Sequence, residues 1–190
     1  MYYDFFGNRT SASYTEDETK SLFLEAYKVA SLSPDPSNQC GAIIVKDRWL
    51  HKLLKIGKRA KILSYGSNKF HKSIEWDDKK IKDRDWKLFH IEHAERNSLY
   101  SLARRGIKTS GLTMICPWFA CSDCARAILH MGITKVIGHK ERMDKTPERW
   151  KASIDAGLEL LHNGGVTLEF WSGIIGEGSP IIVNGELWRP

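Results

Sequence analysis

Two short motifs constrain this chain most, because their side chains make chemical sense only if they meet at one point. The first motif is His93-Ala94-Glu95, and the second is Cys121-Ser122-Asp123-Cys124. A Cys-x-x-Cys pair at the start of a helix puts two thiolates on one side of a turn, and a distant histidine can complete three corners of a zinc tetrahedron. The fold must therefore bring the two motifs side by side.

The two motifs together supply a complete set of groups for metal-assisted acid-base chemistry. We expect His93, Cys121 and Cys124 to bind one Zn²⁺ ion, because three protein ligands leave a fourth position open, as in metal sites that activate water. Glu95 follows the histidine by two residues and is expected to act as the general acid and base without binding the metal. Placing Cys121 at a helix start also favours the thiolate, since helix N-termini carry positive potential.

Each motif has another interpretation when it is taken alone. A His-x-Glu triplet occurs by chance, and a Cys-x-x-Cys pair can be a redox pair or half of a closed, structural zinc site. A closed site needs a fourth ligand, for which Cys116 is the nearest candidate, and His90 and His130 are weaker ones. Cys40 lies in an apolar run and is better explained as a small core residue.

The composition is that of a folded protein of ordinary polarity. The chain has 190 residues, of which 42% are hydrophobic and 27% charged, so we expect one domain and no extended disorder. The net charge of +6 favours an anionic partner, with a basic surface kept for solubility as the alternative. The four unevenly spaced cysteines do not suggest disulfides, and reduced thiols indicate a cytoplasmic location. Neither a signal peptide nor a membrane-spanning segment is expected.

Apolar runs alternate with amphipathic segments along the chain. Thr15 and Glu18 have the spacing of a capping box before a helix, and the prolines within 33–37 must end it. Further helices are expected after His93, after Cys121 and over 150–161. Strands are expected at 40–45, 62–66, 112–116, 135–138 and 166–171. Strand, helix, strand crossovers imply parallel pairing and a layered α/β sandwich.

The remaining segments are expected at the edges of this domain, which spans 15–171. Residues 1–14 are read as an N-terminal arm, and residues 172–190 as a C-terminal tail whose Asn184-Gly185 pair indicates a hairpin. The basic segment 51–61 is an amphipathic connection or a surface for phosphates or an acidic partner. The long polar stretch 69–85 is expected to be a functional or mobile loop.

With these motifs in place, the chain resembles the deoxycytidylate deaminase family of the zinc-dependent cytidine deaminase superfamily. His-x-Glu followed by Cys-x-x-Cys is the metal signature of that superfamily. The stretch Asp35-Pro36-Ser37 and the helix before the last strand of the domain are typical of the nucleotide branch. The resemblance covers residues 15–171 and is carried by the stretches 35–45, 66–68, 92–97, 117–126 and 132–133.

The resemblance implies a three-layer α/β/α sandwich with a five-stranded mixed sheet. It also implies hydrolysis of deoxycytidine monophosphate (dCMP) to deoxyuridine monophosphate (dUMP), and a homo-oligomer, hexameric or dimeric. Deoxycytidine and thymidine triphosphates (dCTP and dTTP) are expected as effectors, with Mg²⁺ accompanying them. By position, Asn68 would contact the sugar or phosphate side of the substrate, and Asn97 would lie near the same pocket. Trp118 and Phe119 would form a wall of the base pocket, with core packing as the alternative.

Two departures from the family pattern affect these expectations. Ala120 replaces the proline that usually precedes the first cysteine, and the loop after Asn68 reads Lys69-Phe70-His71-Lys72 in place of a Gly-x-Pro pattern. Lys69, His71 and Lys72 are the candidate substrate-binding residues of that loop. The alternatives are deamination of another cytosine or adenine nucleotide, deamination of a base in RNA or single-stranded DNA, and a non-catalytic zinc module. A nucleic acid partner is less favoured than a free nucleotide.

Overall fold

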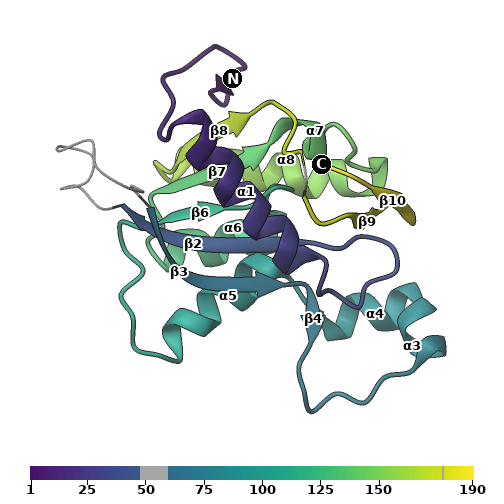
Figure 1. Ribbon diagram of the computed structural model, residues 1–190. Coiled ribbons are helices and arrows are strands. Elements are labelled where there is room, and N and C mark those ends of the chain that lie inside the picture. The colour runs from purple at the N-terminus through teal and green to yellow at the C-terminus, as the bar shows by residue number, and fades with distance from the viewer. Residues whose placement is uncertain (48–59, 177) are drawn as a thin grey trace.

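A computed structural model describes residues 1–47, 60–176 and 178–190, and Figure 1 shows a mixed β-sheet with helices on both faces. In these ranges the main sheet has six strands in the order β1-β8-β7-β6-β2-β3. The strands are β1 (Tyr2–Tyr3), β2 (Gly41–Asp47), β3 (Ala60–Ser67), β6 (Thr113–Ile115), β7 (Lys135–His139) and β8 (Thr167–Trp171). The longer helices are α1 (Glu16–Ala30), α5 (Ala94–Ala103), α6 (Ser122–His130) and α8 (Glu148–Asn163), and α7 (Lys140–Met143) is a single turn.

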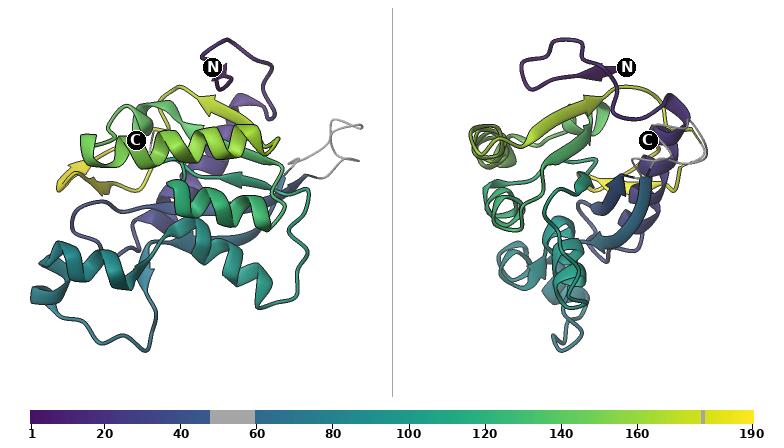
Figure 2. Two further views of the ribbon diagram at one scale, coloured as in Figure 1. Left: turned by 180° about the vertical axis from the view of Figure 1, so that it is seen from behind. Right: turned by 90° about the vertical axis from the view of Figure 1, so that its left-hand side faces the viewer.

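The central strand β2 is buried on both faces, which is why its sequence is a continuous apolar run. Ala42 and Ile44 pack in one core with residues of α5, α6 and α8. Ile43 and Val45 point the other way, into a second core with residues of α1. Figure 2 shows the resulting three layers, with α5, α6 and α8 on one side of the sheet and α1 on the other. The expected α/β/α sandwich is confirmed.

The strand directions follow from the connections between them. β6, β7 and β8 are parallel, and α6 and α8 form the crossovers between them. β2 is antiparallel to both β3 and β6, so the sheet is mixed as expected. The five expected strands are present, and residues 2–3 of the arm add β1 as a sixth strand at the β8 edge.

Glu18 takes part both in the start of the first helix and in a contact with a distant strand. Thr15 is the N-cap of α1, and its side-chain oxygen accepts the backbone N–H of Glu18 at 3.3 Å. The Glu18 carboxylate does not reach back to Thr15, as a full capping box requires. It accepts the backbone N–H of Ala60 at 2.8 Å and so ties α1 to the start of β3.

The segment 69–85 is not the loop that its polarity suggests. It contains β4 (Lys69–Phe70), α3 (Asp78–Lys82) and the start of α4 (Arg84–His90), and β4 pairs with β5 (Ile91–Glu92). The side chains of Asp77 and Asp83 cap the two helices by accepting backbone N–H groups. Phe70, Ile81 and Ile91 form a small apolar core under the segment, so burial stabilises it despite its surface charge.

The C-terminal residues form the hairpin that the Asn-Gly pair predicts. Asn184 has a positive φ of 55° and Gly185 one of 83°, and this turn joins β9 (Ile181–Val183) to β10 (Glu186–Trp188). Ile181 and Val183 pack in the core that contains α1.

Most of the basic segment 51–61 lies outside the described residues. No helix in the described ranges combines the length and the apolar character of a membrane span.

Candidate active site

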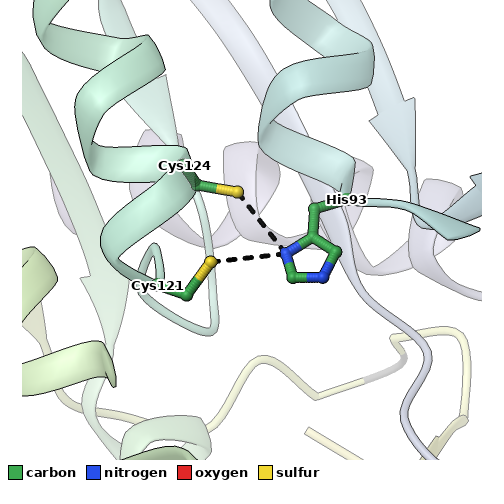
Figure 3. A group of neighbouring side chains, drawn as sticks. All are labelled: His93, Cys121 and Cys124. Atoms are coloured by element: carbon green, nitrogen blue, oxygen red, sulfur yellow. Dashed lines mark hydrogen bonds between the residues drawn. The ribbon is translucent and has the colours of Figure 1, made fainter. Parts of the chain in front are cut away.

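The three expected metal ligands come together where two helices begin (Figure 3). His93 is the N-cap residue of α5 and Cys121 is the N-cap residue of α6, and neither side chain caps its helix by a hydrogen bond. Cys124 lies in the first turn of α6 and is fully buried. The three side chains therefore point toward one another and not toward their own helix ends.

The spacing of these donor atoms fits a tetrahedral zinc ion. The Nδ1 atom of His93 lies 3.5 Å from the Sγ atom of Cys121 and 3.5 Å from that of Cys124. All three ligand atoms lie within 4.8 Å of one another. Tetrahedral zinc with Zn–N and Zn–S bonds of about 2.1 and 2.3 Å puts its nitrogen and sulfur ligands about 3.6 Å apart, close to the distances found here. A single nitrogen and two thiol sulfurs are also the donor types that zinc prefers.

The two thiols differ in proton affinity, although both belong to the same cluster. Hydrogen bonds from Cys124 and His93 lower the pKa of the Cys121 thiol to about 4. The hydrogen bond to Cys121, together with burial, raises the pKa of Cys124 well above its usual value. One of the two sulfurs is thus a thiolate at neutral pH, and the other must lose its proton when a metal binds.

Among the described residues, the metal-binding group contains no fourth protein ligand. Cys116, the nearest candidate from the sequence, points elsewhere, and its thiol donates to the Trp118 carbonyl at 2.8 Å. The Nδ1 atom of His90 is 2.6 Å from the Trp86 carbonyl, and His130 is exposed at the end of α6. The cluster has the three ligands of an open site and not the four of a closed one.

Glu95 lies in the first turn of α5 and lines the same cavity as His93 and Cys121. Only 5% of Glu95 is exposed, and burial raises the pKa of its carboxyl group. A carboxyl group that exchanges its proton closer to neutral pH is suited to proton transfer.

The cavity in front of the cluster has a volume of about 150 Å³. One wall is aromatic and includes Trp118, Phe119 and Trp150. The Trp150 ring makes edge contacts with the rings of His93 and Trp118, each with centroids 6.0 Å apart. The lining also includes the polar side chains of Asp35, Asn38 and Asn68 and the cationic side chains of Lys82, Arg84, Lys87 and Arg149.

Asn68 and Asn97 make hydrogen bonds to their own chain. Asn68 lines the cavity, but its Oδ1 accepts the Cys40 N–H at 2.7 Å and its Nδ2 donates to the Asn38 carbonyl at 2.9 Å. Asn97 does not line the cavity, and its Nδ2 donates to the Ser67 carbonyl at 2.8 Å. Asn97 thus ties α5 to the end of β3.

The candidate residues of the 69–72 loop also lie away from the cavity. Lys69 is exposed because it alternates with the buried Phe70 along β4, whose partner strand is β5. His71 and Lys72 are exposed, and the His71 ring contacts the Ser73 hydroxyl at 2.7 Å. None of the three lines the cavity.

The cations that line the cavity were not identified from the sequence as candidate site residues. Lys82, Arg84 and Lys87 belong to α3 and α4, and Arg149 belongs to the first turn of α8. The helix caps Asp77 and Asp83 are the signal that could have located these helices. Nothing local could have placed Arg149 in the same cavity, because its position there depends on the whole fold.

The sequence model of a known family matches residues 16–140, and its description is "Cytidine and deoxycytidylate deaminase zinc-binding region". The chain belongs to this family. The matched region contains the His-Cys-Cys cluster and Glu95.

Two relatives of this chain match it over most of their own length. An uncharacterised deaminase from the luxG 3' region of Aliivibrio fischeri is 29% identical over 147 residues, which are 77% of this chain and 88% of the relative. The deoxycytidylate deaminase of Enterobacteria phage T4 is 27% identical over 136 residues, 68% of each chain.

The fold is shared with a dCMP deaminase from the cyanophage S-TIM5, whose structure was solved in complex with dCMP and dUMP. The TM-score is 0.56 at 22% identity, and the match covers 83% of this chain and 99% of that one. At this identity the similarity concerns the fold alone.

Proposed function

We propose that this protein is a zinc-dependent deaminase that hydrolyses dCMP to dUMP and ammonia. The observation that carries the proposal is that one cavity contains both a reaction centre and a cationic region. His93, Cys121 and Glu95 line it together with the cations Lys82, Arg84 and Arg149. Deamination of a cytosine ring needs the metal ligands and Glu95, and binding of a 5'-phosphate needs the cations. The name of the phage T4 relative, a deoxycytidylate deaminase, supports the same substrate.

The cationic region favours a nucleotide over a free nucleoside. Lys82 and Arg149 have no ion pair within the described part of the chain, and Arg84 approaches only the exposed Asp85, at 3.6 Å. Exposed pairs of that kind are weak, so all three cations are available to an anionic ligand. Charge-assisted hydrogen bonds to a phosphate are about twice as strong as those between neutral groups.

Different residues of the cavity have different roles in the proposed reaction. His93, Cys121 and Cys124 would hold the zinc ion, which when bound acts as a Lewis acid and lowers the pKa of a water ligand toward about 7. The oxygen of water bonds to C4 of cytosine, and the bond from C4 to the exocyclic nitrogen breaks. Glu95 carries one proton from the water to the ring nitrogen N3 and a second to the leaving amine, which departs as ammonia. The Trp118 and Phe119 rings flank the base and exclude water from it.

A substrate panel tests the proposal. Zinc-loaded protein is incubated with dCMP, deoxycytidine, CMP, dCTP and a deoxycytidine-containing oligonucleotide, and the uracil products are separated by chromatography. We expect kcat/KM for dCMP to exceed that for deoxycytidine at least about a hundredfold, a ratio that corresponds to about 2.7 kcal/mol. Equal turnover of the two would contradict the nucleotide assignment, and faster turnover of the oligonucleotide would favour the nucleic acid alternative.

Glu95→Gln separates catalysis from metal binding in the same assay. Zinc content should be unchanged, while kcat falls at least about a hundredfold, the usual scale for the loss of a general acid and base. Glu159→Gln, an exposed substitution on α8, is the matched control. Full activity of Glu95→Gln would favour a different proton carrier, and no activity in any variant or in the wild type would favour a non-catalytic zinc module.

The expected homo-oligomer, the dCTP and dTTP effectors with Mg²⁺, and the cytoplasmic location remain predictions. Size-exclusion chromatography with light scattering addresses the oligomer. Initial rates with added dCTP or dTTP, with and without Mg²⁺, address the effectors.

A further inference from the structure

Arg142 is a buried cation that the proposed reaction does not use. It lies in α7, directly after β7, and only 1% of the residue is exposed. A guanidinium of this size has five N–H donors and remains charged in proteins, so its burial carries a large desolvation cost. Such a cost is usually offset by a carboxylate partner.

The surroundings of Arg142 are neutral within the described part of the chain. Its Nη2 donates to the Asn38 side-chain oxygen at 3.0 Å, and its Nη1 has no hydrogen-bond partner among the described residues. No carboxylate of those residues forms an ion pair with it. Burial raises the pKa of the nearby Cys40 thiol to about 12 and that of Tyr27 well above 10, so both are uncharged. Salt-bridge stabilisation does not explain why this arginine is buried.

Arg142 also contacts an aromatic ring. Its Cζ atom lies 4.2 Å from the centroid of the Trp118 ring, within the range of a cation–π contact. Trp118 lines both the substrate cavity and a small space of about 10 Å³ that Arg142 lines with Cys40. Trp118 is thus a wall shared by the two spaces, and Arg142 supports it from behind.

The two groups that Arg142 contacts both line the substrate cavity, and they come from segments far apart in the chain. Trp118 precedes the helix α6, whereas Asn38 precedes β2. Both have other attachments as well. The Trp118 Nε1 donates to the Thr146 hydroxyl at 2.9 Å, and the Asn38 side-chain oxygen also accepts the backbone N–H of Asn184 at 3.1 Å. The hairpin of β9 and β10 is therefore linked to the same cluster.

We propose that Arg142 is a positioning residue that fixes Trp118 and Asn38 relative to each other and so sets the shape of the base-binding part of the cavity. The proposal rests on the proposed function, because it assigns Trp118 to the wall of the nucleobase site. Arg142 has no contact with the reacting atoms. Its effect is on how well the cavity accepts the base, and on KM more than on kcat.

The main experiment compares Arg142→Lys with Arg142→Met. Lysine keeps the charge but lacks the planar guanidinium that stacks on an aromatic ring and bonds an amide at the same time. We expect both variants to raise the KM for dCMP at least about tenfold, with kcat changed less than about threefold and zinc content unchanged. Arg104→Lys, at an exposed position after α5, is the control.

A double-mutant comparison distinguishes positioning from general stabilisation. In a Trp118→Leu background, Arg142→Lys should change the KM less than about twofold, because one of the two groups that Arg142 holds in place relative to each other is already absent. An equally large change of KM in both backgrounds would overturn the proposal, as would an unchanged KM for Arg142→Lys. If Arg142→Met does not fold, the lysine variant alone decides these outcomes.

A measurement without substrate keeps this proposal separable from the proposed function. In protein labelled with 5-fluorotryptophan, the Trp118 signal is assigned from Trp118→Phe, and Arg142→Lys should shift it in the ligand-free protein. An unmoved signal would contradict the proposal even if dCMP is the substrate. If the wild type does not deaminate dCMP, the proposed function fails, while a shifted signal would still support the contact that positions Trp118.

Discussion

The Lys87 Nζ atom donates to the Asp35 Oδ1 atom at 2.7 Å, and both side chains are only 9% exposed. The pair lies in the wall of the substrate cavity and joins α4 to the segment before β2. Asp35 also accepts hydrogen bonds from the backbone N–H groups of Ser37 and Asn38 and from the side-chain amide of Asn68. Lys87 has one other acceptor, the Ser37 hydroxyl at 3.2 Å. The carboxylate is therefore much better supported than the ammonium group.

Because of this asymmetry, we expect removal of Asp35 to lower the free energy of unfolding by a different amount from removal of Lys87. Asp35→Ala leaves a buried ammonium with one hydroxyl partner, and we expect a loss of about 4 kcal/mol in the free energy of unfolding. Lys87→Met leaves a carboxylate that keeps three donors, and the loss should be smaller, about 2 to 3 kcal/mol. Urea unfolding of the two variants measures the difference.

The exposed pair Lys20 and Glu16 supplies the control for that comparison, with a distance of 3.8 Å. Lys20→Met should change the free energy of unfolding by less than about 0.5 kcal/mol. A larger loss for Lys87→Met than for Asp35→Ala would mean that the lysine, and not the carboxylate, has the better support.

Zinc binding should depend on Cys124 and not on Cys116. Cys124→Ser removes a thiolate ligand, so we expect loss of stoichiometric zinc after dialysis and a lower melting temperature. Cys116→Ala removes a buried thiol that donates to the Trp118 carbonyl, and zinc content should remain near one ion per chain. Metal analysis by mass spectrometry measures both. Retention of zinc by Cys124→Ser, or its loss from Cys116→Ala, would require a different ligand set.

Substrate phosphate should be recognised by the cations of the cavity and not by the 69–72 loop. Arg84→Met and Arg149→Met should each raise the KM for dCMP between about tenfold and a hundredfold, because a charge-assisted hydrogen bond contributes about 1.5 to 3 kcal/mol. The KM for deoxycytidine should not change, since that substrate has no phosphate.

Lys72→Met is the matched control for the cations, because Lys72 is exposed and lies away from the cavity. It should leave both KM values within about twofold of the wild type. Steady-state kinetics with the two substrates decides the matter. A large effect of Lys72→Met with none from Arg84→Met would place the phosphate at the loop.

His139 should make the fold less stable in mild acid. Burial lowers the pKa of this histidine below its usual 6.5, although the Gly173 carbonyl and Glu141 oppose the shift. Its neutral ring is fully bonded, with Nδ1 2.6 Å from the Tyr27 hydroxyl and Nε2 2.9 Å from the Gly173 carbonyl. The unfolded chain therefore binds the proton more readily than the folded chain. Stability is lost as the pH falls below about 6.5 toward the lower pKa of the folded state.

Urea unfolding at pH 8 and pH 5.5, at one fixed zinc concentration, measures this effect. The loss of stability between the two values should be smaller for His139→Gln than for the wild type, because glutamine does not titrate. The exposed substitution His130→Gln should reproduce the wild-type loss. Identical losses in wild type and His139→Gln would show that the acid sensitivity has another source, such as the metal site.

The sequence by itself determined which residues form the metal cluster and that the sheet is layered, because each motif and each apolar run is a short pattern. The spacing of Cys121 and Cys124 within one helical turn fixes their sulfurs on one side, whatever surrounds them. The two-faced apolar run of β2 predicts a strand that is covered on both faces. Thr15 likewise predicts the start of α1 from a bond that spans three residues.

Only the tertiary structure decided which polar side chains surround the substrate cavity. Arg84 and Arg149 are distant in the chain and meet there because α4 and α8 are positioned by separate apolar cores. Asp35 and Lys87 pair across 52 residues, and Arg142 reaches Asn38 across 104. A charged residue has no periodic signal that identifies its partner. Its role depends on the distances that the packed core imposes, and not on its neighbours in sequence.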